Sequence, residues 1–263
     1  MEHKSAAKAG IKKFYVPLIS VCAIVSMWLV WLIAYYAVGN EYVVPSVGGT
    51  VAEIGGLLIS ADYWLAFCMT LMRTLGAWAV SCVVGIALAA VSAAGRGARA
   101  FIETFVSVFR TLPVMAVTLM LLIWTSRGVA PMIVAFLTVC PIMYAQLMAA
   151  YDGIDGGLRD MAAVYGVSRF ERIVKIYFPQ MLPPVLAQTG ANISLALKVI
   201  ISAEVLSSTF RSLGGMINDA NMFLRTSQMF ALTITVLVAG GLIEWSFGKL
   251  ARITDKWTGG GVK

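Results

Sequence analysis

The chain has 263 residues, of which 60% are hydrophobic and only 13% are charged, and its formal net charge is +7. Soluble domains carry about 25% charged residues, so this composition excludes an ordinary water-soluble globule. A helix of about 20 apolar residues can cross a bilayer, and the sequence contains about six such stretches. These predicted spans cover residues 15–38, 64–94, 112–126, 129–150, 183–206 and 229–249.

The spans predict one all-α integral membrane domain at residues 15–252, between a basic tail at 1–14 and a flexible C-terminal tail at 253–263. Four lysines precede the first span, as in the basic region of a signal peptide: Lys4, Lys8, Lys12 and Lys13. The apolar run that follows, of about 23 residues, exceeds the 7–15 typical of a signal, and no convincing cleavage site follows it. We therefore expect the first span to be a retained helix.

Lysine and arginine residues are concentrated on one side of the predicted spans. The inner segments hold Lys4, Lys8, Lys12, Lys13, Arg96, Arg99, Arg110, Arg159, Arg169, Arg172, Lys175, Lys249, Arg252, Lys256 and Lys263. The outer segments hold only Arg127, Arg211 and Arg225. Because cytoplasmic loops carry such an excess, the pattern predicts a multi-pass protein of the bacterial inner (cytoplasmic) membrane, with both termini in the cytoplasm. The basic charge then reflects topology in lipid, and no nucleic-acid partner is expected.

A short outer segment follows the first span. Pro45 and Ser46 predict a turn in it, and the next residues predict an amphipathic helix at the membrane interface. The apolar stripe of this helix consists of Val51, Ile54, Leu57 and Leu58.

The inner loop at about 151–182 is a charged island between two spans, and it predicts two short helices hinged at Gly166. Ser168 and Glu171 have the spacing of a capping box, so a new helix should begin just after the glycine. Each helix has apolar residues at positions i, i+3, i+4 and i+7, which form one face. The two faces consist of Leu158, Met161, Ala162 and Tyr165, and of Phe170, Ile173, Val174 and Tyr177. One face can pack on the membrane domain, which leaves the other for a partner.

This loop resembles the cytoplasmic loop of ABC importer permeases, whose pattern is E-A-A-x3-G-x9-I-x-L-P. Asp160-Met161-Ala162 takes the place of E-A-A, Gly166 is the glycine, Ile176 is the isoleucine, and Phe178-Pro179 replaces Leu-Pro. The spacing matches throughout. The departures keep the charge of the first residue and leave the helix-turn-helix intact.

The wider chain is similar to the nitrate/sulfonate/taurine branch of these permeases, from about Val44 to the end of the last hydrophobic segment. That branch has similar residues at the positions of Val44-Pro45-Ser46, Arg73, Arg110-Thr111-Leu112-Pro113 and Ala203-Glu204. The resemblance implies the type I (MetI-like) ABC importer permease fold with about six transmembrane helices. It also implies a small anionic solute of the nitrate, sulfonate or taurine class.

The resemblance further implies a two-fold permease dimer, two cytoplasmic ATPase subunits and an external solute-binding protein. ATP and Mg would be held by the ATPase, and no cofactor is expected in this chain. Coupling to the ATPase is expected from Leu158, Asp160, Met161, Ala162, Tyr165, Gly166, Ser168 and Glu171. In this role, Asp160 caps or pairs charges at the docking surface, Gly166 permits the turn, and Met161 and Tyr165 fill a groove of the ATPase.

The fifth span is unusually polar, and we expect Pro183 and Pro184 to open it. Lys198 lies about 5 Å from its middle, where a charge costs about 2.5–3.5 kcal/mol on insertion scales. Glu204 lies on another face of the same helix, so the two should not pair within it, and a pair across a dimer remains open. The residues assigned to a solute path are Asn192, Ser194, Lys198, Ser202 and Glu204.

Two interpretations of Lys198 remain open: it attracts an anionic solute, or a neighbouring helix neutralises it. The small residues beside it equally suit helix packing. Arg73, near the outer end of the second span, should snorkel to the headgroups. Glu244, near the inner end of the last span, should snorkel or pair with another helix.

Several sequence patterns are absent. No G-x-x-x-x-G-K-[ST] sequence occurs, so ATP binding through a P-loop is not expected, and there is no H-E-x-x-H or G-x-S-x-G. The four cysteines form no C-x-x-C pair, which speaks against a zinc site or a disulfide framework. Two alternatives to an importer are a secondary transporter driven by an ion gradient and an integral membrane enzyme. The single histidine and the lack of a catalytic constellation disfavour the enzyme.

Overall fold

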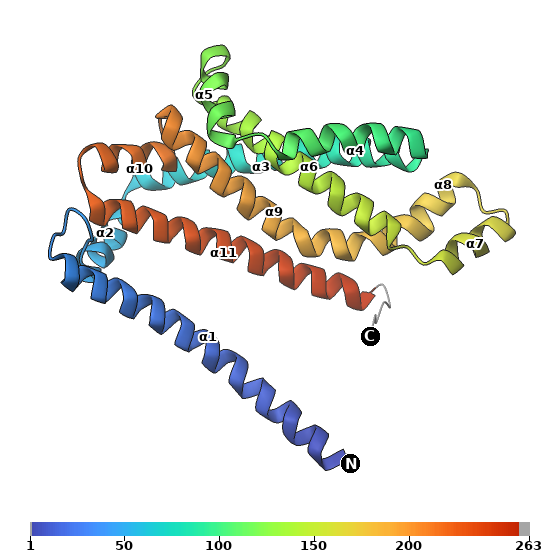
Figure 1. Ribbon diagram of the computed structural model, residues 1–263, viewed down its shortest axis with the longest axis horizontal. Helices are drawn as coiled ribbons and strands as arrows, with labels where there is room; N and C mark the ends of the chain where they lie inside the picture. The colour runs from blue at the N-terminus through green and yellow to red at the C-terminus, as the bar shows by residue number, and fades with distance from the viewer. Residues whose placement is uncertain (1, 258–263) are drawn as a thin grey trace.

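The computed structural model describes residues 2–257, and within this range every regular element is a helix (Figure 1). In chain order these are α1 (Glu2–Val38), α2 (Val47–Ile59), α3 (Ala61–Ala93), α4 (Arg96–Arg110), α5 (Val114–Trp124), α6 (Ala130–Asp152), α7 (Gly156–Val164), α8 (Arg169–Arg172), the π-helix η1 (Ile173–Tyr177), α9 (Phe178–Ser207), α10 (Leu213–Met222) and α11 (Thr226–Trp257). The all-α prediction is therefore confirmed over the described residues.

The helices α3, α4, α6, α9 and α11 run side by side along the long axis of the molecule (Figure 1). One end of this bundle carries α2 and α10, and the opposite end carries α7 and α8. The N-terminus and the end of α11 lie toward the same end as α7 and α8.

Within residues 2–257, five helices are long and apolar enough to cross a membrane, and a bent pair would make a sixth, which agrees with the predicted number of spans. The bent pair is α4 and α5, whose axes differ by 91°. The third span predicted at 112–126 is wrong as a single straight crossing, because α5 has 11 residues and is about 16 Å long. Pro113 precedes α5, and a proline disfavours helical geometry in the residue before it.

The centre of the bundle is packed by small and medium side chains from α3, α6 and α9. Ala77, Ala135 and Ile200 form one buried cluster. At Gly85, an added Cβ would lie 3.2 Å from the Met143 Cβ, so α3 and α6 approach closely there. Small residues at such crossings are typical of helix packing in membranes, where van der Waals contact drives association.

The helix α1 diverges from the bundle, and its Trp31 contacts the rest of the chain near the C-terminal end of the helix (Figure 1). There the Trp31 Nε1–H donates to the Pro45 carbonyl at 3.2 Å, and the Trp31 ring lies 5.6 Å from that of Phe230. None of the residues in its apolar stretch Val21–Val38 is buried. The first predicted span lies within this helix, which already begins at Glu2. At the other terminus α11 continues to Trp257, and residues 258–263 of the predicted tail lie outside the described residues.

Candidate functional site

The turn between α7 and α8 is closed by the predicted glycine. Gly166 has φ +63°, in the left-handed region that favours glycine. The Val167 N–H donates to the Ala162 carbonyl at 3.0 Å, and the Gly166 N–H donates to the Ala163 carbonyl at 3.3 Å. These bonds satisfy the carbonyls that the end of α7 would leave free, as in a Schellman motif. The predicted hinge at Gly166 is therefore confirmed.

Ser168 starts the next helix as predicted. Its Oγ accepts a hydrogen bond from the Glu171 N–H at 3.3 Å and donates to the Glu171 Oε2 at 3.0 Å. The Lys175 Nζ lies 2.9 Å from the Glu171 Oε1, one turn further on. Ser168 and Glu171 therefore order the first turn together.

The helix that begins here is longer than predicted. It passes from α8 through η1 into α9 and ends at Ser207, so the second short helix of the loop is the first part of a span. Pro183 and Pro184 lie inside this helix, and the prediction that they open the span is wrong. The π-helix η1 immediately precedes Phe178-Pro179, where proline lacks an N–H and the regular ladder is interrupted.

The α7–α8 turn exposes a set of large apolar side chains, here called the loop patch. Its members are Met161, Val164, Tyr165, Phe170, Ile173 and Val174. Val164 is 84% exposed and Tyr165 is 79% exposed, whereas Ala162 is fully buried. The predicted face of α7 is thus divided: Ala162 packs inward, Leu158 is half-buried, and Met161 and Tyr165 face outward.

The buried side of the turn is held by arginines. The Arg172 Nη2–H donates to the carbonyls of Ala162 at 3.2 Å and Val167 at 3.3 Å. The Arg159 guanidinium stacks 4.8 Å from the centre of the Tyr151 ring, at the end of α6. The loop patch is therefore presented by a turn that is anchored to the bundle. Asp160 is exposed beside it.

Glu204 is fully buried near the α10 end of the bundle, where three groups of the protein surround its carboxylate. Its Oε1 lies 2.9 Å from the Arg73 Nη1, and its Oε2 accepts from the Thr70 hydroxyl at 2.9 Å and the Gly214 N–H at 3.3 Å. The prediction that Arg73 snorkels to the headgroups is wrong, because α9 supplies a carboxylate within its reach. This network joins α3, α9 and α10.

Gly214 allows α10 to lie against Glu204. A Cβ added at Gly214 would lie 2.4 Å from the Glu204 Cβ and 2.6 Å from the Ile201 carbonyl oxygen. No real Cβ approaches so closely, so α10 could not keep this position with a larger residue there. The close approach also brings the Gly214 N–H to the carboxylate.

Asn192 is buried in α9 and pairs with a residue that the sequence did not single out. The Gln146 Nε2–H donates to the Asn192 Oδ1 at 3.1 Å, and the Asn192 Nδ2–H donates to the Gln146 Oε1 at 2.6 Å. Paired amides of this kind satisfy buried polar groups between α6 and α9. The polarity of Gln146 within a predicted span was the available signal for this partner.

The exposed face of α9 differs from the exposed faces of its neighbours. Lys198 and Ser202 are exposed on it, whereas Ser194 is buried beside Gly240. The exposed residues of this face are Pro184, Ala187, Gln188, Ala191, Lys198 and Ser202. By contrast, α3 and α11 expose large apolar side chains such as Met72, Val83, Ile86, Leu237, Val238 and Leu242. The α9 face is therefore poorly suited to contact with lipid chains.

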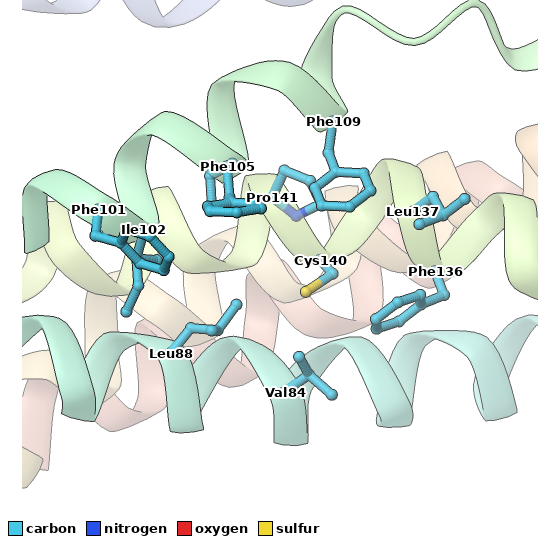
Figure 2. A pocket seen from close by; sticks show the side chains of 11 residues that line it. Val84, Leu88, Phe101, Ile102, Phe105, Phe109, Phe136, Leu137, Cys140 and Pro141 are labelled. Atoms are coloured by element: carbon cyan, nitrogen blue, oxygen red, sulfur yellow. The ribbon is translucent and has the colours of Figure 1, made fainter. Parts of the chain in front are cut away.

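A cavity of about 340 Å³ lies between α3, α4 and α6, and Figure 2 shows the side chains around it. It is lined by Val84, Leu88, Phe101, Ile102, Phe105, Val106, Phe109, Phe136, Leu137, Cys140 and Pro141. No charged side chain is among them, so this cavity does not suit a charged solute. Across the described residues, no group of three or more histidine, cysteine, aspartate or glutamate side chains suits a metal ion.

Relatives of the chain are transport permeases. It is 23% identical over 235 residues to the putative aliphatic sulfonates transport permease protein SsuC of Bacillus subtilis. This alignment covers 89% of this chain and 84% of that protein. It is 21% identical over 211 residues to the taurine transport system permease protein TauC of Escherichia coli. This alignment covers 80% of this chain and 76% of that protein.

Solved structures show the same fold. The inward-facing MetNI methionine ABC transporter matches with a TM-score of 0.66 at 15% identity, over 74% of this chain and 99% of that chain. An amino acid ABC transporter with histidines matches with a TM-score of 0.58 at 17% identity, over 72% of this chain and 90% of that chain. These similarities confirm the type I ABC importer permease fold.

Residues 81–255 match the model of the family described as binding-protein-dependent transport system inner membrane component. The match covers most of the chain and includes the α7–α8 turn, Lys198 and Glu204. It confirms the resemblance drawn from the loop pattern. The chain is therefore a member of the binding-protein-dependent transport system inner membrane components, the permease subunits of ABC importers.

Proposed function

We propose that this permease carries a small anionic solute and is driven through its α7–α8 turn by a cytoplasmic ATPase. The observation that carries the proposal is the loop patch. Val164, Tyr165 and Phe170 are each at least 75% exposed at the end of an anchored helical turn. A protein surface with several large apolar side chains in one place is typical of an interaction site.

The orientation follows from the distribution of charge. The end of the bundle with α7 and α8 carries Arg159, Arg172 and Lys175, and the start of α4 adds Arg96 and Arg99. Cytoplasmic segments of membrane proteins carry such an excess, so this end would face the cytoplasm together with both termini. The loop patch is then on the side where an ATPase is available.

The solute path would run along the exposed face of α9. This face is small and polar, and Lys198 lies on it within the apolar span. A charge in that position needs water, a carboxylate or an anion near it. Because Lys198 is exposed on the single subunit, a second copy of the chain facing it across a two-fold axis would enclose the path between them.

The residues of the path would have different roles. Lys198 and Ser202 would face the solute. Asn192 and Glu204 are held by partners within the chain, so they would position α9. Ser194 is buried where α9 crosses α11.

The solute class is supported by the relatives described as sulfonate and taurine permeases. Sulfonates carry a negative charge at every physiological pH, which agrees with a lysine on the path. A solute-binding protein would deliver the solute at the α10 end. Two copies of the permease and two ATPase subunits, with ATP and Mg held by the ATPase, would complete the transporter.

Co-purification tests this proposal. The full-length chain is expressed with a candidate ATPase and a candidate solute-binding protein from the same organism and is isolated in a gentle detergent. We expect the ATPase to remain bound and uptake of a sulfonate to require ATP. Uptake that is driven by an ion gradient, with no ATPase bound, would instead indicate a secondary transporter.

A further inference from the structure

A second cavity, of about 190 Å³, lies between α9 and α11, and side chains of opposite charge line it. Lys198 of α9 and Glu244 of α11 contribute the charges. Ser194, Gly240 and Gly241 line the cavity between them, and their small size leaves the space open. Both charged residues lie within helices apolar enough to cross the membrane.

Neither charged side chain has a partner among the residues that the structure describes. No ion pair within 4.0 Å and no side-chain hydrogen bond joins Lys198 or Glu244 to another group. This differs from Arg73 and Glu204, which pair with each other at 2.9 Å in the same bundle. An unpaired charge within a span calls for a compensating group.

Lys198 and Glu244 line the cavity from its two ends, and both are also exposed at the surface of the single chain. An added Cβ would lie 3.0 Å from the Ser194 Oγ at Gly240 and 2.9 Å from the Glu244 Cα at Gly190, so α9 and α11 are antiparallel. Lys198 and Glu244 are each one turn beyond the Ser194–Gly240 contact, on opposite sides of it. With a rise of 1.5 Å per residue, their Cα atoms are about 12 Å apart along the axes.

Helical side chains lean toward the N-terminus of their own helix. For Lys198 this direction points toward Ser194, and for Glu244 it points toward Gly240. The two heads therefore approach from opposite ends and leave a gap between them. At about 30 Å³ for each water-sized group, the cavity has room for a solute of about six to seven non-hydrogen atoms.

We infer that this cavity binds a small zwitterionic solute, whose acidic group pairs with Lys198 and whose amino group pairs with Glu244. A simple anion would pair with Lys198 but would be repelled by the Glu244 carboxylate. A solute with both charges satisfies the two side chains at once. The inference rests on the proposed function and narrows its solute class from anions in general to amino acids of the sulfonate or similar type.

Three probes separate the contributions of the two charges. They are 2-aminoethanesulfonate with both charges, ethanesulfonate with only the negative one, and ethylammonium with only the positive one. Binding of each probe to the full-length chain in lipid nanodiscs is measured by calorimetry. We expect 2-aminoethanesulfonate to bind at least about tenfold more tightly than either fragment, which corresponds to one additional charged contact.

Single substitutions should remove one charge preference each. With Glu244→Gln, 2-aminoethanesulfonate should bind no better than ethanesulfonate, and with Lys198→Gln it should bind no better than ethylammonium. Glu53→Gln, at an exposed glutamate of α2, is the matched control and should leave all three affinities unchanged.

Two results would overturn the inference. One is equal binding, or no binding, of the three probes to the unsubstituted chain. The other is a direct Lys198–Glu244 ion pair, in which each single substitution lowers the melting temperature, the double substitution restores it, and no probe is preferred. If the chain still co-purifies with an ATPase and supports ATP-dependent uptake of a sulfonate, only this inference fails and the proposed function stands.

Discussion

The two ends of the bundle differ in what they bury and what they expose. At the α10 end, Glu204 is fully buried, and Arg73, Thr70 and Gly214 satisfy its carboxylate. At the α7 end, Val164 and Tyr165 are exposed on a turn that Arg159 joins to Tyr151 of α6. The buried charge at the first end is satisfied within one chain, whereas the apolar loop patch at the second end is exposed on it. Substitutions at the two ends should therefore affect different properties.

Loss of Arg73 should have the largest effect on folding. Arg73→Ala leaves the Glu204 carboxylate buried without its cation, and breaking a buried pair in this way costs about 3–5 kcal/mol. Thermal unfolding in detergent measures the loss. Arg99→Ala is the control, because Arg99 makes its ion pairs with Asp152 and Glu103 at the exposed surface and should matter little. Equal effects of the two substitutions would remove the contrast between buried and exposed pairs.

Gly166→Pro should abolish transport while the spans stay folded. Proline cannot adopt the φ of +63° at this position, so the α7–α8 turn must change its path. ATP-dependent uptake in vesicles should fall at least about tenfold, the equivalent of 1.4 kcal/mol. Gly55→Ala, at an α2 glycine with open space around it, is the control and should transport normally. Normal uptake by Gly166→Pro would contradict a coupling role for this turn.

Gly214→Ala should disturb the α10 end without touching a charge. The added Cβ would lie 2.4 Å from the Glu204 Cβ, so α10 must move away from α9. Overpacking of this kind costs about 1–3 kcal/mol. Thermal unfolding again measures it, with Gly48→Ala in α2 as the control, since nothing lies within 4 Å there. An unchanged melting temperature would indicate that α10 is held less firmly than its contacts imply.

Val164→Asp should give the smallest change in stability and a specific change in binding. Val164 is 84% exposed, so the folded chain loses almost no buried contact. Burial of such a side chain against a partner contributes about 1.5–3 kcal/mol, so affinity for the ATPase should fall about tenfold or more. Val51→Asp, at an exposed valine of α2, should leave this affinity unchanged. Titration of the purified ATPase against each variant distinguishes the two.

Much of the α7 end could be predicted from the sequence, because its signals are local. The glycine at 166, the Ser168–Glu171 spacing and the apolar periodicities all act within one or two turns of helix. The same reasoning failed where a helix continues through prolines, as at Pro183 and Pro184, because helical packing on both sides outweighs the local penalty. The 91° bend between α4 and α5 was also missed, since amphipathic periodicity carries no information about the angle between two helices.

The α10 end could not be predicted in the same way. Arg73 and Glu204 are 131 residues apart, and Gln146 and Asn192 are 46 residues apart. Each of these residues was visible as a polar group in a span, but nothing in the sequence paired them. Their contacts depend on how far each helix is rotated about its axis, and one residue changes that rotation by about 100°.

The sequence by itself determined that this chain is a bundle of membrane helices with a hinged, apolar turn at one end. Composition, charge asymmetry and short-range spacing are sufficient for those features. Only the tertiary structure decided which charges are satisfied: it brought Arg73 to Glu204 and placed Lys198 and Glu244 around one cavity, with neither paired to another described residue. The physical reason is that charge pairing depends on a few ångströms between separate helices, a distance set by the packing of small residues where the helices cross.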